Sequence, residues 1–409
     1  MTGLKTALMS ACAAVITAGA AYAVEPVEFE VSGSAAFVGG VSQGEAAGDV
    51  DADVEVKGST FLDNGIELGG VINARLDGQQ PSSTFGGGRY TSLLIGGPRG
   101  IAPLTSDAFL QGAYAYARGG FGQVIVGRDQ GVARTLAVTS PTIFKSLNVN
   151  DWRTDLSGIN DVHTVNDFTG HATKLSYLPP ANFLGGVVGG LQLGVSYSPS
   201  LSNCGDRLCA PESSIVLSPD GTLLTETSSW EDAVEAALYY QTGFNVGRSS
   251  ERLLLGVGAS YVTADEDAQT ALPIFDDYEA YSVGLNLAYR GITIGGSVKT
   301  TNAGLAATAA GDDGYLAFDA GVTCRTGEES GDVAVMLGFG QSEANVVSVN
   351  PFNPVLFRDT QTTQVGVSYV LSRGISIGAA AQYVESRGPA QIGGDEEATT
   401  VVIESSIKF

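Results

Sequence analysis

The last eleven residues of the chain, 399–409, constrain its fold more than any other segment, because apolar and polar side chains alternate along them. One set of alternate positions is apolar and holds Val401, Ile403, Ile407 and Phe409. The interleaved set is mostly polar and holds Thr400, Val402, Glu404, Ser406 and Lys408. Successive side chains of a β-strand point to opposite faces, so the pattern predicts a strand with one face toward hydrocarbon and the other toward water.

The same alternation recurs along the rest of the chain. In one segment Ile66, Leu68 and Ile72 share a face, whereas Glu67 and Arg75 share the other. We expect sixteen such strands, near residues 28–40, 51–61, 65–77, 107–118, 120–128, 170–178, 189–198, 233–241, 252–263, 279–289, 291–301, 313–325, 331–342, 362–371, 374–385 and 399–409. The predicted fold class is all-β, a transmembrane antiparallel β-barrel of about sixteen strands.

The connections between these strands alternate in length. Long ones are expected near 41–50, 78–106, 129–169, 199–232, 264–278, 302–312, 343–361 and 386–398. The intervening ones are mostly tight, such as Asp63-Asn64-Gly65 and Arg290-Gly291, whose Asn and Gly residues tolerate positive φ. Short turns at one end and long loops at the other are typical of an outer-membrane barrel. A soluble secreted β-sandwich or propeller, the all-β alternative, has no reason to sort its loops in this way.

Composition narrows the class of protein further. The sequence has no run of 18 apolar residues, which argues against helical membrane spans. Only 16% of residues are charged and the mean hydropathy is +0.13, a balance that suits a wall with one oily and one wet face. The formal net charge of −23 argues against nucleic-acid partners, because binding them requires Lys and Arg to displace counterions.

The N-terminal residues have the pattern of a secretory signal peptide. Lys5 precedes an apolar stretch over 7–19, and Ala21-Tyr22-Ala23 supplies small residues at the cleavage positions. We therefore expect residues 1–23 to be removed and residues 24–409 to form the barrel domain. A transmembrane anchor is the alternative, but the apolar run is short for one.

Three cysteines follow the predicted cleavage site. Cys204 and Cys209 lie in a polar loop and could form a disulfide in an oxidising compartment; the alternative is two free thiols. Cys324 lies in a predicted strand and is expected to be a small apolar side chain. The spacing of Cys and His matches no zinc site, so we expect no metal centre and no cofactor.

The segment 121–128, which reads Phe-Gly-Gln-Val-Ile-Val-Gly-Arg, carries a resemblance to a known family. It resembles the strand before the third external loop in general bacterial outer-membrane porins, the sixteen-stranded trimeric family of the alphaproteobacterial type. The signal peptide and the terminal Phe409 add to this resemblance. The resemblance implies an outer-membrane location and a homotrimer. The implied partners are outer-membrane lipid and lipopolysaccharide, the barrel-assembly machinery that reads Phe409, and small hydrophilic solutes.

The resemblance also implies where function resides. Porins fold their third external loop into the lumen as a constriction, and here that loop is residues 129–169. Its acids are Asp129, Asp151, Asp155, Asp161 and Asp167. Basic candidates for the facing lumen wall are Lys57, Arg75, Arg118, Arg128, Lys174 and Lys299. Opposed charges would order water across the pore and exclude apolar solutes, and the acidic balance predicts a weak preference for cations.

Further acids gather in the predicted external loops 199–232, 264–278 and 386–398. Carboxylate oxygens suit Ca²⁺, which these loops could hold weakly; the alternative is a solvated acidic surface. An enzymatic barrel would need an ordered nucleophile and base, but His163, His171, Ser157 and Ser176 form no such set. The porin resemblance implies a diffusion channel that passes small hydrophilic solutes and ions. The remaining alternatives are a substrate-selective channel and a plugged structural or adhesive barrel.

Overall fold

The structure is a computed structural model. It describes residues 26–77, 107–150, 156–181, 190–201, 214–217, 223–226, 228–246, 251–268, 277–302, 314–347, 355–388 and 394–409. The predicted signal peptide at 1–23, the acids Asp151 and Asp155, and the cysteines Cys204 and Cys209 lie outside these ranges. In the part of the chain that is described, no helix is long and apolar enough to cross a membrane.

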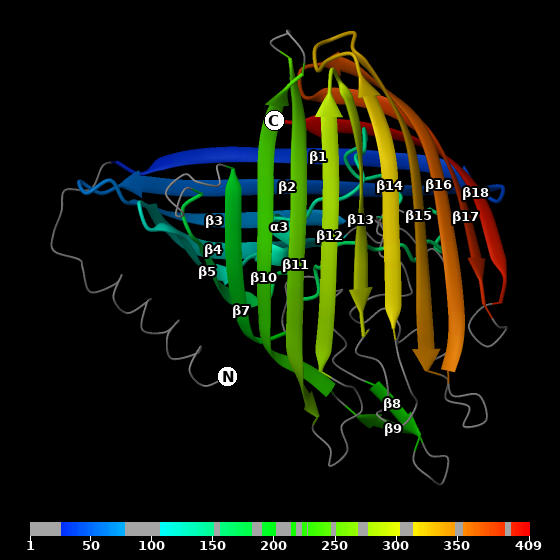
Figure 1. The fold of residues 1–409 in the computed structure, drawn as a ribbon, viewed down its shortest axis with the longest axis horizontal. Helices are drawn as coiled ribbons and strands as arrows, with labels where there is room; N and C mark the ends of the chain where they lie inside the picture. Colours follow the sequence, from blue (N-terminus) through cyan, green and yellow to red (C-terminus); the bar gives the residue numbers. More distant parts are fainter. Residues whose placement is uncertain are drawn as a thin grey trace.

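The described strands close into one antiparallel barrel in which neighbours along the chain pair with each other (Figure 1). The barrel strands are β1 (Glu28–Ser42), β2 (Glu45–Phe61), β3 (Glu67–Asp77), β4 (Asp107–Gly119), β5 (Gly122–Arg128), β6 (Thr173–Leu178), β7 (Leu191–Ser200), β10 (Ser228–Asn245), β11 (Arg252–Ala268), β12 (Tyr278–Tyr289), β13 (Ile292–Thr301), β14 (Tyr315–Arg325), β15 (Val333–Val347), β16 (Val355–Ser372), β17 (Ile375–Arg387) and β18 (Glu396–Lys408). These sixteen strands correspond one to one with the predicted ones, so the predicted fold class is confirmed.

The predicted two faces of the strands are observed. On β18, Val401 and Ile403 are each 56% exposed on the outside of the barrel, whereas Thr400 and Val402 are buried inside it. On β12, Tyr281 is likewise exposed. An apolar outer face and a mostly polar inner face are the arrangement that a barrel in lipid requires.

The barrel closes where its two terminal strands meet. β1 pairs with β18 from Ser34 opposite Lys408 onward, and the backbone N–H groups of Gly33 and Phe409 each donate to the carbonyl of the other at 3.0 Å. The Phe409 ring lies over Gly33, where a Cβ atom would come within 2.8 Å of the ring. The glycine therefore gives room for the terminal aromatic side chain to pack over the seam, on the outside of the barrel.

The turn between β1 and β2 corrects one prediction. The expected long connection at 41–50 is wrong, because the strands continue to a two-residue turn formed by Gln43 and Gly44. Their φ angles of 52° and 89° match the twist of a tight hairpin. The predicted tight turn at Arg290 and Gly291 is confirmed, with φ angles of 51° and 78°.

Strand ends are the other difference from the predictions. β10, β11 and β16 begin or end several residues beyond the predicted bounds, in sequence outside the recognised alternating segments. Backbone pairing continues there because hydrogen bonds of the ladder need no apolar face. The segment 199–232, expected to be a loop, also contains a small hairpin of β8 (Ser214–Leu217) and β9 (Leu223–Glu226).

Candidate functional site

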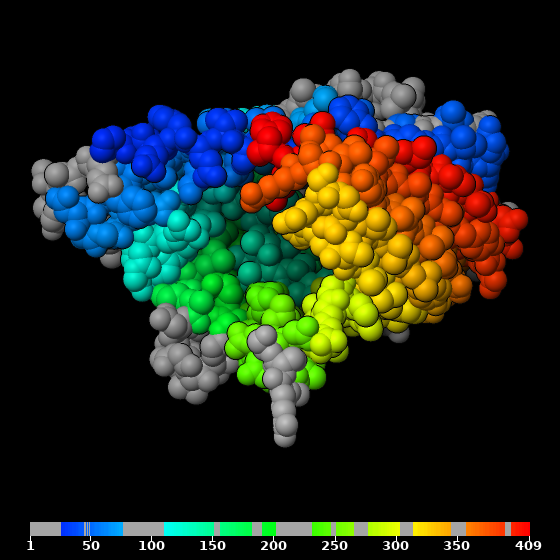
Figure 2. All heavy atoms as spheres, turned by 90° about the horizontal axis from the view of Figure 1, so that it is seen from above, coloured from blue at the N-terminus to red at the C-terminus, as the bar shows by residue number. Residues whose placement is uncertain are grey.

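The connection between β5 and β6, residues 129–172, packs against lumen-facing side chains; we call it loop 3. It begins with the short helix α3 (Val132–Thr135) and is described except for residues 151–155. Figure 2 looks into a hollow whose deep surface is teal, the colour of the chain after β5. Residues of this long segment lie against the lumen wall; that function resides there stays a prediction.

A buried carboxylate on β18 holds the middle of loop 3. Glu404 is 3% exposed, and its two oxygens accept hydrogen bonds from the backbone N–H groups of Lys145 at 2.8 Å and Ser146 at 3.0 Å. A third N–H group, that of Leu147, lies 3.3 Å from the same carboxylate. A charged acceptor makes such bonds stronger than neutral ones, so this side chain fixes the turn of the loop.

Two other buried wall carboxylates hold loop 3 in the same way. Asp319 on β14 accepts from the Ser140 backbone N–H at 2.9 Å and from the Asn150 side-chain amide at 2.8 Å. Glu235 on β10 accepts from the backbone N–H of Ala133, in α3, at 3.0 Å. The exposed fractions of Asp319 and Glu235 are 3% and 1%, so each charge requires protein partners. Loop 3 supplies several of them, and Ser297 on β13 also donates to Asp319.

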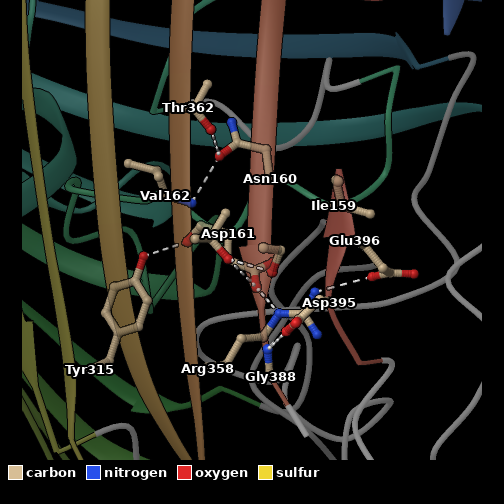
Figure 3. Close-up of polar contacts among 12 residues, drawn as sticks. Ile159, Asn160, Asp161, Val162, Tyr315, Arg358, Thr362, Gly388, Asp395 and Glu396 are labelled. Atoms are coloured by element: carbon tan, nitrogen blue, oxygen red, sulfur yellow. Dashed lines mark hydrogen bonds and ion pairs between the residues drawn. The ribbon is translucent and has the colours of Figure 1, made fainter. Parts of the chain in front are cut away.

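A buried ion pair joins the outgoing half of loop 3 to β16. The guanidinium of Arg358 contacts the Asp161 carboxylate at 3.0 Å and that of Glu396 at 3.2 Å (Figure 3). The Tyr315 hydroxyl donates to the Asp161 carbonyl and accepts from the His163 backbone N–H at 2.8 Å. Arg358 and Asp161 are 1% and 4% exposed, so removing Arg358 would leave the Asp161 carboxylate buried without its cation, whereas Arg358 has a second partner in Glu396.

Apolar contacts fill the space between loop 3 and the wall. Phe144, Leu147 and Leu156 form one buried cluster with wall residues that include Val38 and Val402. Glycines on the wall make room for it: a Cβ atom at Gly366 would lie 2.5 Å from the Phe144 ring. This explains why Val402, apolar on an otherwise polar face, is buried inside the barrel.

Two of the predicted wall bases also bind loop 3. The Lys299 ammonium donates to the Val165 carbonyl at 2.9 Å. The Lys174 ammonium donates to the Thr169 hydroxyl at 2.8 Å and to the Gly170 carbonyl at 2.6 Å. Both lysines are buried, and their charges are used in holding the loop.

Several lumen-facing charges of β2, β3 and β4 contact one another, and Asp53 on β2 contacts the Lys145 ammonium of loop 3. The Lys57 ammonium lies 3.6 Å from the Glu67 carboxylate, which also binds the Arg118 guanidinium. The Arg75 guanidinium lies 3.3 Å from the Asp51 carboxylate. Lys57, Arg75 and Arg118 thus lie on the lumen face, as predicted.

The prediction that Arg128 lies on the lumen wall is wrong. Arg128 pairs with Ala113 on β4 and with Thr173 on β6. It follows Val126 by two residues, and Val126 is 51% exposed on the outer face. Register alternates with period two, so this position belongs to the outer face. The resemblance supplied Arg128 as the end of a motif, without regard to its register.

The predicted loop acids are paired rather than arrayed toward the pore. Asp161 binds Arg358, and the Asp167 carboxylate contacts the His163 ring at 2.6 Å. Burial raises the pKa of the Asp129 carboxyl, which follows β5, to about 6. The described part of loop 3 therefore does not form the expected row of acids facing a basic wall.

Sequence reasoning missed the residues that hold the loop. Glu235, Asp319, Glu404 and Arg358 each occupy a lumen-facing position in the interior of a strand. A charged side chain on the polar face of a strand is ordinarily solvated. Its place in the alternating pattern therefore does not identify it as a residue that binds the loop. The signal that could have found them is the need to satisfy the backbone N–H groups of a long loop that enters the barrel.

Comparison with known proteins bears on the identity of this barrel. The sequence model of the Gram-negative porin family matches residues 7–389. The chain belongs to the Gram-negative porin family. The members of that family are channels rather than enzymes, and the chain is thus a porin-type outer-membrane channel. No curated protein matches it by sequence.

Solved structures share the fold of this porin. A porin refined at 1.8 Å resolution is 16% identical, with a TM-score of 0.52 over 93% of this chain and 100% of that one. Salmonella typhi OmpF in complex with daunomycin is 13% identical, with a TM-score of 0.54 over 93% and 97%. The outer-membrane channel DcaP of Acinetobacter baumannii is 11% identical, with a TM-score of 0.55 over 94% and 98%. At such identities the likeness establishes the fold alone.

Proposed function

We propose that this porin is a passive diffusion channel for small hydrophilic solutes and ions, and that loop 3 is its constriction. One observation carries the proposal: three buried wall carboxylates, Glu235, Asp319 and Glu404, bind donor groups of the loop. A loop bound at three points around the wall occupies part of the lumen and leaves the rest for solute. The polar lining favours solutes that exchange hydrogen bonds with water for those with the wall.

We further propose that the channel prefers cations weakly. The chain carries a net charge of −23, which raises the concentration of cations near the pore. On the lumen face of β2, Asp51, Asp53 and Glu55 occupy successive inward positions. The lumen also holds Lys57, Arg75 and Arg118, so the expected selectivity is modest.

Export and assembly belong to the same proposal. Residues 1–23 would be cleaved on export, residues 24–409 would insert as a homotrimer among outer-membrane lipid and lipopolysaccharide, and Phe409 would be read by the barrel-assembly machinery. The apolar outer face and the exposed terminal aromatic, with Phe409 66% exposed, support insertion into lipid. Acidic external loops could bind Ca²⁺ weakly.

Single-channel recording from the purified protein in a planar bilayer tests this function. We expect stable conductance steps, in multiples of three if the trimer is the unit, and a reversal potential under a salt gradient that indicates slight cation preference. Folded, membrane-inserted protein that carries no current would contradict the proposal and favour a plugged structural barrel.

A further inference from the structure

Loop 3 borders a polar cavity of about 280 Å³. Its lining comes from both halves of the loop, from Arg134 in α3 to Val165 in the outgoing half. Most of the lining side chains are polar, among them Thr139, Asn148 and Asn150. A volume of this size is enough for a solute of a few heavy atoms together with its water.

The charged side chains at this cavity are of one sign. Arg134 and Lys145 line it, and among the described residues that do so none is an aspartate or a glutamate. The side chains of Arg134 and Lys145 are 36% and 23% exposed, so both are reachable from the lumen. In a chain with a net charge of −23, a cavity lined by two cations and no acid is unusual.

Surrounding contacts hold both cations in place. The Lys145 backbone is bound to Glu404, and its ammonium lies 3.1 Å from the Asp53 carboxylate on β2. Arg134 is in the last turn of α3, with its guanidinium 3.9 Å from the Asp167 carboxylate. Because these two side chains are already held in place, the protein would lose less conformational entropy when a solute binds.

We propose that this cavity binds the oxyanion group, a carboxylate or a phosphate, of a small solute that crosses the pore. The inference rests on the proposed channel function. Arginine and lysine are the side chains that recognise such groups, and neighbouring hydroxyl and amide groups can add neutral hydrogen bonds. The site lies on the loop, opposite the acids of β2, so positive charge is on the loop and negative charge on the wall. That polarity is the reverse of the one expected from the sequence.

Current block in single channels tests the proposal. Succinate and inorganic phosphate are added separately to the full-length porin in a planar bilayer, with uncharged erythritol as the reference solute. In the wild-type channel we expect succinate, phosphate or both to reduce the current in a saturable manner, and erythritol to have no such effect. In the variant Arg134→Gln/Lys145→Gln the concentration for half block should rise about tenfold, because two charge-assisted contacts are lost.

A matched variant separates a site from a general effect of charge. Arg118→Gln also removes a lumen cation, but one that does not line the cavity, and it should leave the half-block concentration unchanged. Block by succinate alone would identify carboxylate solutes, and block by phosphate alone would identify phosphate-bearing ones. Conducting channels that neither anion blocks, or an equal effect of both variants, would overturn the inference. A wild-type protein that does not conduct would overturn the proposed function instead.

Discussion

The two sides of the lumen use their charged residues in opposite ways. On β10, β14, β16 and β18 the inward charges are buried and bind loop 3, as Glu404 and Asp319 do. On β2, β3 and β4 the inward charges are mostly paired within the wall, as in Lys57 with Glu67, and several stay partly exposed. The comparison indicates that the buried charges of β10, β14, β16 and β18 position the loop, whereas on β2 the loop meets the partly exposed Asp53.

The difference follows from what each side must satisfy. A loop that enters a barrel brings backbone N–H groups out of water, and each requires an acceptor. Carboxylates on the wall provide several acceptor sites each, and the loop N–H groups in turn compensate for burying the charge. On β2, β3 and β4, neighbouring side chains of the wall provide many of these partners, as Lys57, Arg118 and Tyr116 do for Glu67.

The largest expected effect is from Asp319→Ala, because this carboxylate accepts from the Ser140 and Ser297 backbones and from Asn150 and Thr164. Several buried donors would lose the acceptor that they share, and the free energy of unfolding should fall by about 5 kcal/mol. We expect a lower unfolding midpoint in denaturant and large current fluctuations from the detached loop. Glu67→Gln, on the other side of the lumen, is the matched control and should keep a quiet channel.

Arg358→Met should have the next largest effect on stability. It leaves the Asp161 carboxylate buried without its cation, at a cost of about 3 kcal/mol. Denaturant unfolding of this variant measures the loss. The double variant Arg358→Met/Asp161→Asn removes both charges and should recover much of the lost stability. If its loss of stability equals the sum of the losses of the two single variants, the pair is not coupled.

Asp53→Asn should reduce the preference for cations with little change in stability. The side chain is 35% exposed and its contact with Lys145 is partly solvated, so the ratio of cation to anion permeability should fall by less than about twofold. The reversal potential under a salt gradient gives that ratio. An unchanged ratio would indicate that the β2 wall does not face the ion pathway.

The smallest expected effect is a pH dependence from Asp129. Its pKa is about 6 in the folded porin, above the value of ~4 for an unfolded aspartate. The cost of burying its charge is therefore present above pH 6 and is relieved as the pH falls from 6 toward 4. We expect a slightly lower cation preference at pH 5 than at pH 7.5. Reversal potentials of Asp129→Asn should lack this component; an identical pH response would contradict the assignment.

Much of the fold could be predicted from the sequence, because the alternation of apolar and polar side chains along a strand shows which face meets lipid and which meets water. The outward positions of Val401 and Ile403 follow from it. The tight turn at Arg290 and Gly291 follows instead from the tolerance of glycine for positive φ. The β1–β2 turn was missed because β2 begins with Glu-Ala-Ala-Gly, which does not alternate between apolar and polar, and Gln43 is not a typical turn residue. The alternation of apolar and polar side chains ends before the strands do, whereas backbone pairing continues to the ends of the strands.

The site was predicted in location but not in chemistry. A long connection after β5 indicated loop 3, yet its acids proved to be paired, as Asp161 is with Arg358. The phase of a strand places Glu404 in the lumen but does not say whether water or a loop meets it there. That depends on contacts between residues more than 250 positions apart, such as Lys145 and Glu404, which no local pattern records.

The most direct test of this account is the size limit for uncharged sugars entering liposomes that contain the porin. The wild type is compared with the variant Glu404→Ala/Asp319→Ala, which removes two of the buried wall carboxylates that bind loop 3. The account predicts that the wild type admits only small sugars and that the variant admits larger ones, because the loop leaves the lumen. The same size limit for both proteins would contradict the claim that wall carboxylates hold loop 3 as the constriction.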